Sequence, residues 1–120
     1  MKDRDAKKFE NIVKTIELVM SYCEKETLNT FLSNNMLSDA CAMRILVLAE
    51  DASQISTDCQ RLYPQVNWGS IRGLRNRIAH DYFGIDFEIL WEIIQNDLPL
   101  LKSQITEILV SFNKPSKKFD

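Results

Sequence analysis

Apolar residues recur every three or four positions along most of this chain, which is the spacing of one face of an α-helix. Residues that form turns are scarce, because the 120 residues include only three glycines and three prolines. Average usage would give roughly eight glycines and six prolines at this length. A β-sandwich or barrel needs many turns, so the counts argue against that class and favour an all-α fold with few connections.

The periodicity predicts three helices in the N-terminal half. The first spans residues 5–24, and a short second helix follows Thr27, whose side chain is suited to cap it. The cluster at residues 33–35 then offers a cap for a third helix. This third helix is expected to be the longest, from residue 36 to residue 62, because Pro64 disfavours helical geometry in the residue before it.

Two more helices are predicted in the C-terminal half. The fourth covers residues 68–82, with Asn67 as its cap and Gly84 ending it in a left-handed turn. The last begins after Asp86, whose side chain can cap it, and reaches residue 112, with a kink or break at Pro99. Short connections favour antiparallel neighbours, so the prediction is an up-and-down bundle of four to five helices.

The length fits one domain. We expect a single helical domain over residues 1–112 and a polar, frayed tail over residues 113–120.

Charge and missing motifs exclude several classes of function. The net charge is −2, whereas domains that bind nucleic acid nonspecifically are strongly basic, so an RNA contact must depend on a local basic patch. No GxGxxG or GxxxxGK[ST] string is present, which excludes those nucleotide sites. The sequence has no long apolar run and no signal-peptide pattern, so we expect a cytoplasmic protein without a membrane span. The cysteines at 23, 41 and 59 lack metal-ligand spacing and are predicted to be small core residues.

Polar side chains crowd the end of the predicted fourth helix around the single histidine of the chain. They are Arg72, Arg75, Asn76, Arg77, His80 and Tyr82. Asn76 and His80 are four positions apart, so they lie on one side of a helix. Arg75 and Tyr82 are seven positions apart and share a second line along it. The apolar residues of this segment, at positions 71, 74 and 78, form the inward stripe.

Histidine and arginine together suit the cleavage of an RNA phosphodiester. Histidine gives or takes a proton near neutral pH, and arginine binds phosphate through a planar fork of donors. His80 would move a proton on the 2′-OH or on the leaving 5′ oxygen, while an arginine stabilises the phosphorane. This chemistry needs no metal and no cofactor. Residue chemistry alone leaves a second interpretation, in which His80 caps a helix end and Arg72 and Arg77 are solvated or position phosphate.

The eight residues from Arg75 to Tyr82, RNRIAHDY, fit the Arg-x4-His-x-Tyr motif of the HEPN superfamily. The longer segment 66–101 resembles HepT-like proteins nearly throughout. The resemblance implies an all-α homodimer in which two motifs form one composite site, and a toxin ribonuclease that acts without metal. It implies that Arg75 and His80 are catalytic and that Asn76 supports the site. Ala49 is a departure, because a glycine commonly precedes the glutamate on the long helix.

The same resemblance implies a partner. In such pairs, a minimal nucleotidyltransferase neutralises the toxin by transferring AMP from ATP to the motif tyrosine, which corresponds to Tyr82. In the ribonuclease interpretation, Arg72 and Arg77 would contact RNA phosphates. The alternative is a non-catalytic docking or substrate-binding subunit of the transferase, which would need mainly Tyr82 and a docking surface. The sequence does not identify the RNA target.

Overall fold

The computed structural model describes residues 3–113. Helices account for most of them, and no strand occurs within this range, so the all-α prediction is confirmed. The α-helices are α1 (Asp3–Tyr22), α2 (Leu28–Ser33), α3 (Asn35–Ser53), α4 (Thr57–Leu62), α5 (Trp68–His80), α6 (Phe87–Glu92) and α7 (Leu98–Asn113). A 3₁₀ turn, η1 (Tyr82–Gly84), follows α5, and a π-helical segment, η2 (Ile93–Asp97), joins α6 to α7. Most of the predicted tail, residues 114–120, lies outside the described residues.

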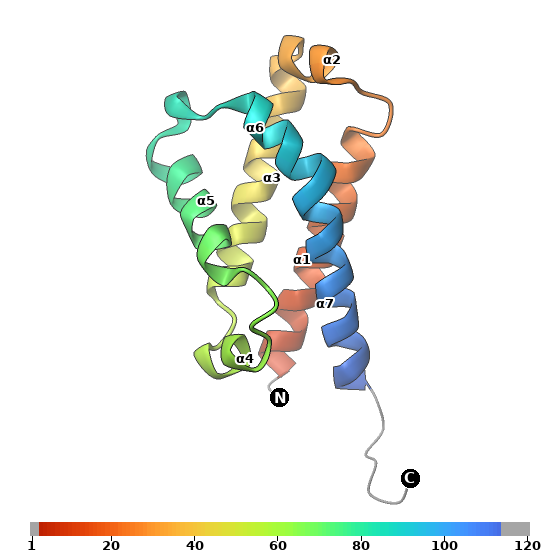
Figure 1. Cartoon of the computed structure of the whole chain (residues 1–120), viewed down its shortest axis with the longest axis vertical. Coiled ribbons are helices and arrows are strands. Elements are labelled where there is room, and N and C mark those ends of the chain that lie inside the picture. The colour runs from red at the N-terminus through yellow and green to blue at the C-terminus, as the bar shows by residue number, and fades with distance from the viewer. Residues whose placement is uncertain (1–2, 114–120) are drawn as a thin grey trace, which may run out of the picture.

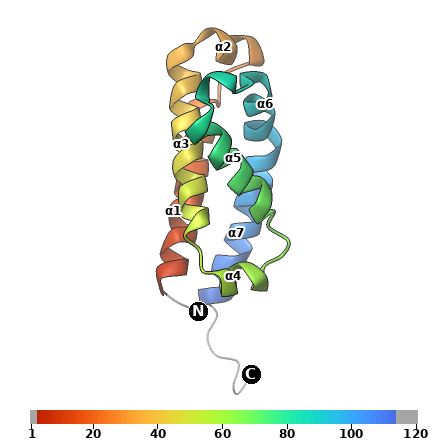
Figure 2. The same ribbon diagram turned by 90° about the vertical axis from the view of Figure 1, so that its left-hand side faces the viewer.

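Four long rods run alternately up and down along the molecule: α1, α3, α5 and the column formed by α6, η2 and α7 (Figures 1 and 2). α3 packs against α1 on one side and α5 on the other, and α1 also packs against α7. The order of packing therefore matches the predicted up-and-down bundle, and it leaves α5 at the edge, held mainly by α3.

The predicted apolar stripes form one core. In α1 the buried residues Phe9, Ile12, Ile16 and Val19 keep the helical spacing of the sequence. All three cysteines are buried, as predicted. The Sγ atoms of Cys23 and Cys41 lie 3.7 Å apart and join the end of α1 to α3. No described helix is long and apolar enough to cross a membrane.

The prediction of one long helix over residues 36–62 is wrong, because the chain breaks after Ser53 and restarts as α4. The restart is fixed by Ser56, whose side chain caps α4 by accepting from the N–H of Cys59. Asp5, buried in α1, accepts from the backbone N–H of Ser56 at 2.9 Å and from its hydroxyl at 2.7 Å. This contact stabilises a non-helical geometry that helical periodicity alone does not reveal.

Two other predicted ends need correction. α5 ends at His80 rather than at residue 82, and none of the described glycines has a positive φ, so Gly84 forms no left-handed cap. A Cβ at Gly84 would instead collide with the carboxylate of Asp81. The break expected at Pro99 takes the form of η2, which ends at Asp97, two residues before the proline. A π-helical turn adjusts the hydrogen bonding that a proline cannot complete.

Candidate functional site

α5 carries the motif, and local bonds fix where it begins and how it faces. The side chain of Asn67 caps it by accepting from the N–H of Ser70 at 3.0 Å, as predicted. The indole of Trp68 donates to the carbonyl of Tyr63 at 3.1 Å and packs near Phe9 in the core. Ile78 is buried, so this inward stripe leaves the polar residues of α5 on its outer sides.

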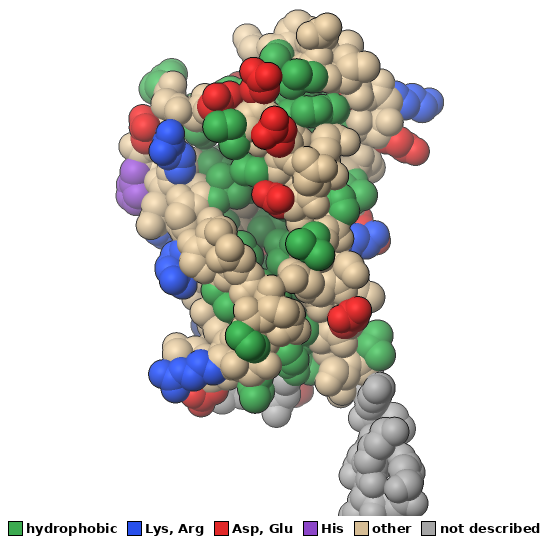
Figure 3. Space-filling model, in the orientation of Figure 1, with side chains coloured by type: hydrophobic (Ala, Val, Ile, Leu, Met, Phe, Trp, Pro, Cys, Tyr) green, Lys and Arg blue, Asp and Glu red, His purple; other side chains and the backbone are tan. Residues whose placement is uncertain are grey.

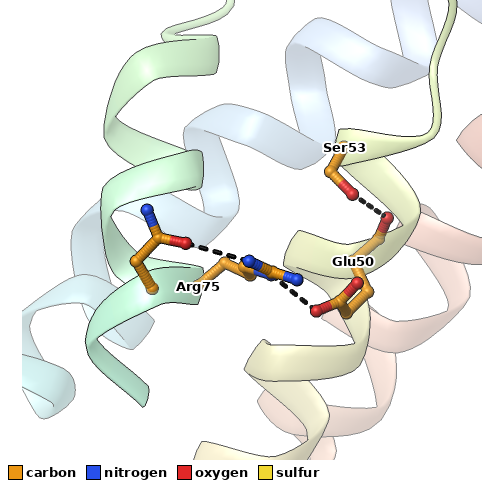
Figure 4. A network of polar contacts seen from close by, with 4 residues as sticks. Glu50, Ser53 and Arg75 are labelled. Carbon is orange, nitrogen blue, oxygen red and sulfur yellow. Dashed lines mark hydrogen bonds and ion pairs between the residues drawn. The ribbon is translucent and has the colours of Figure 1, made fainter. Parts of the chain in front are cut away.

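Arg75 is held in place from α3. Its Nε donates to Oε1 of Glu50 at 2.6 Å, and its Nη1 donates to Oδ1 of Asn76 at 3.0 Å. Figure 4 shows the guanidinium reaching from α5 to Glu50 on α3. Among the described residues these are its only hydrogen-bond partners, which leaves most of the five guanidinium N–H groups for a ligand. Glu50 and Asn76 therefore fix the position and orientation of the guanidinium.

His80 is the last residue of α5, and its side chain is exposed. Residues 3–113 offer its ring no hydrogen-bond partner. In the space-filling view it lies at the outer edge of the molecule, on the side where α5 also carries basic side chains (Figure 3). A solvent-facing imidazole of this kind is available to a substrate, and no packing role accounts for its position.

Arg75 and His80 do not converge within one chain. Five positions on a helix correspond to about 140° of rotation, so His80 points away from the α3 side to which Arg75 turns. Arg72 shares the Arg75 side, near the C-terminal end of α3. Arg77 instead lines a hollow beside Ile85 and Asp86, on the α6 side of α5. The predicted phosphate contacts are thus divided between two sides of the helix.

The position of Tyr82 differs from the prediction. α5 ends at His80, so Tyr82 is not on the helical line that it was expected to share with Arg75. The start of η1 turns its ring toward α3, where its hydroxyl donates to Oδ1 of Asp39. The rings of Phe83 and Phe87 lie 6.3 and 6.0 Å from its own, measured between centroids. Burial, followed by the contact with Asp39, raises the pKa of Tyr82 to about 12.

Asp39 is a site residue that the sequence reasoning missed, since it lies 43 positions from Tyr82. The only signal in the sequence is its spacing from Glu50. Eleven positions make about three helical turns, so both acids lie on the face of α3 that meets the motif. Their two contact points are about 16 Å apart along the helix. Residues 3–113 contain no group of three or more acidic, histidine or cysteine side chains placed to hold a metal ion.

Comparison with known proteins agrees with the motif. The family model described as ribonuclease HepT-like matches residues 12–108. A candidate RNase of Methanocaldococcus jannaschii is 32% identical over 88% of this chain and 97% of its own length. The "Probable ribonuclease HepT" of Thermococcus cleftensis is 27% identical over 82% of this chain and 90% of its own. A candidate RNase of Caldanaerobacter subterraneus is 26% identical over 83% of this chain and 89% of its own length.

No solved structure gives a significant match. The family model covers most of the chain, and the M. jannaschii relative aligns over nearly its full length. The chain therefore belongs to the HepT-like ribonuclease family.

Proposed function

We propose that this chain is a metal-independent endoribonuclease, the toxin of a toxin–antitoxin pair, which cleaves RNA at a cleft shared by two copies of the chain. Family membership and the names of its relatives support ribonuclease activity. The observation that carries the proposal is the Arg75 guanidinium, held by Glu50 and Asn76 with most of its donors uncommitted, on the helix that ends in exposed His80.

The proposed chemistry divides the work between these two side chains. Arginine presents a fixed fork of donors that matches a phosphate and keeps its charge at any working pH. Histidine exchanges a proton near neutral pH. His80 therefore takes the 2′-OH proton or gives one to the leaving 5′ oxygen, and Arg75 stabilises the charge on the phosphorane.

A site built from two chains is supported by the divergence of Arg75 and His80 around α5. A second support is an apolar strip on α3, which we call the α3 strip and define as Met36, Met43 and Val47. These residues are 85%, 58% and 40% exposed, and spacings of seven and four positions place them on one face of the helix. The strip lies beside the face that bears Asp39 and Glu50. Pairing of two strips across a twofold axis would bury apolar surface and bring two motifs together.

Replacing Met43 with glutamate is expected to convert the homodimer to a monomer, because a charge at the centre of an apolar interface loses its hydration without a partner. RNA cleavage should fall with it. Light scattering measures the mass, and cleavage of a labelled RNA measures the activity.

Val110→Glu is the matched control for this test. The exposed fraction of Val110, 54%, is similar to that of Met43, but Val110 lies on α7, away from the α3 strip. This variant should stay dimeric and active. A Met43→Glu protein that remains a fully active dimer would contradict the α3 interface, and a wild-type monomer at micromolar concentration would contradict the shared cleft itself.

We also propose that a minimal nucleotidyltransferase acts as the antitoxin and transfers AMP to Tyr82. Phe83, next to Tyr82, is fully exposed, and exposed aromatic residues are common anchors of protein interfaces. This exposure also favours the second candidate function, a non-catalytic docking subunit of the transferase. The two candidates differ in one respect, since only the ribonuclease requires Arg75 and His80.

A further inference from the structure

The contact between Asp39 and Tyr82 links two segments that are far apart in the sequence. Asp39 lies in the second turn of α3, and Tyr82 opens the turn that follows α5. The phenol donates its proton directly to Oδ1 of Asp39. The tyrosine ring packs against the core beside Phe87, whose ring centroid lies 6.0 Å away, and the exposed ring of Phe83 lies 6.3 Å away.

We propose that Asp39 is the catalytic base for modification of Tyr82, accepting the phenolic proton as the oxygen attacks phosphorus. The inference rests on the proposed transfer of AMP to this tyrosine. In that step the bond between Oη and the α-phosphorus forms, and the bond from that phosphorus to pyrophosphate breaks. Pyrophosphate leaves, and the proton passes from Oη to the Asp39 carboxylate and then to water. The products are the tyrosyl-AMP ester, pyrophosphate and one proton.

The surroundings of the two acids on this face of α3 suit them to different tasks. Glu50 is paired with Arg75 at 2.6 Å, so its charge is compensated. Asp39 forms no ion pair with any described lysine or arginine. No described cation therefore competes with the phenol for this carboxylate, and within residues 3–113 Asp39 is the only hydrogen-bond partner of the Tyr82 hydroxyl.

The state of the phenol explains why a base is needed. Because the pKa of Tyr82 is raised to about 12, very little of its hydroxyl is ionised at pH 7. Attack by the free phenolate is therefore rare near neutral pH. Removal of the proton during the attack avoids that requirement, and a positioned base typically contributes 10²–10⁴ in rate.

The alternative is that Asp39 only holds η1 against α3. This alternative predicts the opposite effect of replacing Asp39 on the reactivity of Tyr82. Burial and the nearby Asp39 charge both hold the pKa of Tyr82 up. Removing that charge lowers the pKa and releases the hydroxyl. If Asp39 were merely structural, its replacement would therefore increase the phenolate fraction of Tyr82 near neutral pH, and labelling there would not fall.

The test uses a fluorophosphonate probe, which a tyrosine hydroxyl attacks at phosphorus with loss of fluoride, so no partner protein is required. Labelling rates are measured for Tyr82, Tyr22 and Tyr63 by peptide mass spectrometry between pH 6 and pH 10. In Asp39→Asn, labelling of Tyr82 at pH 7 should fall roughly 10²–10⁴-fold. The deficit should shrink or reverse by about pH 10, as the lowered pKa supplies more phenolate.

The control variant is Asp58→Asn, which removes an exposed acid of α4 and should leave all three tyrosines unchanged. Tyr22 and Tyr63 have no carboxylate at their hydroxyls within residues 3–113, so they report the general reactivity of tyrosine in each protein. Equal or faster labelling of Tyr82 in Asp39→Asn at pH 7 would overturn the proposal. Wild-type Tyr82 that labels no faster than Tyr22 and Tyr63 would also overturn it.

Failure of this inference is distinct from failure of the proposed function. A partner transferase that leaves wild-type Tyr82 unmodified would remove the proposed AMP transfer without changing the fluorophosphonate result. Where the transferase does act on Tyr82, Asp39→Asn should slow the addition of AMP at pH 7 by a similar factor. An unchanged rate of addition would overturn the role of Asp39 while leaving the modification of Tyr82 intact.

Discussion

Replacing His80 with alanine is expected to lower the rate of RNA cleavage by roughly 10²–10⁴ while leaving the helical fold and the dimer intact. The reason is that the side chain is exposed at the end of α5 and has no partner among the described residues, so its loss removes proton transfer and little packing. Initial rates on an end-labelled RNA measure the effect. Circular dichroism and light scattering check the fold and the mass.

Arg75→Ala is expected to have an effect of similar size, because it removes the donors that would stabilise charge on the phosphorus. Arg75→Lys should not restore the rate, since lysine lacks the planar fork that both binds phosphate and reaches Glu50. Arg61→Ala is the matched control, because that arginine is exposed on α4 and pairs only loosely with Asp58, at 3.8 Å. Full activity in His80→Ala would contradict the catalytic role of His80, whereas a wild-type protein that cuts no RNA would support the docking-subunit function.

The second large effect is expected at Tyr82. The partner transferase, with ATP and Mg²⁺, should add one or more AMP units of roughly 329 Da each, a covalent change that brings charge and bulk. Tyr82→Phe should block the addition and make the toxin resistant to neutralisation, because it removes the attacking hydroxyl and keeps the ring that packs near Phe83 and Phe87. Intact mass spectrometry measures the addition. Undiminished labelling of the phenylalanine variant would refute Tyr82 as the acceptor.

Under the proposed function, such a modification would inhibit by changing the surroundings of Tyr82. A phosphodiester on Tyr82 has no proton to donate to Asp39 and carries a negative charge, so the tyrosine would leave its place on α3. The contacts of Tyr82 and Arg75 with α3 are about 16 Å apart, so the added phosphate would not simply pair with Arg75 of the same chain. AMP would instead exclude RNA by its charge and bulk across the shared cleft.

Features that depend on neighbouring residues could be predicted from the sequence. The caps at Thr27, Asn67 and Asp86 are confirmed, because each side chain bonds to a backbone N–H two or three positions away. The restart at Ser56 could not be predicted, because its partner, Asp5, lies 51 positions earlier. Helical periodicity continues across that point, and only the tertiary contact interrupts it.

The same division holds at the candidate site. The hydrogen bond from Arg75 to Asn76 was not predicted, because helical spacing groups Asn76 with His80 and adjacent residues diverge around the helix. The inward stripe that includes Ile78 was predicted from its spacing. The position of Tyr82 was not predicted, since the expected helix ran two residues past the end of α5 and placed Tyr82 in line with Arg75. Asp39 was missed because nothing local distinguishes it from other exposed acids.

The most direct test of the central claim is the cleavage of a labelled RNA by the purified wild-type protein in EDTA, with His80→Ala alongside. The account predicts that the wild-type protein cuts the RNA at the same rate with and without EDTA, and that the variant cuts it at least about 10²-fold more slowly. Cleavage that appears only when a divalent metal is added back, or that persists undiminished in His80→Ala, would contradict it.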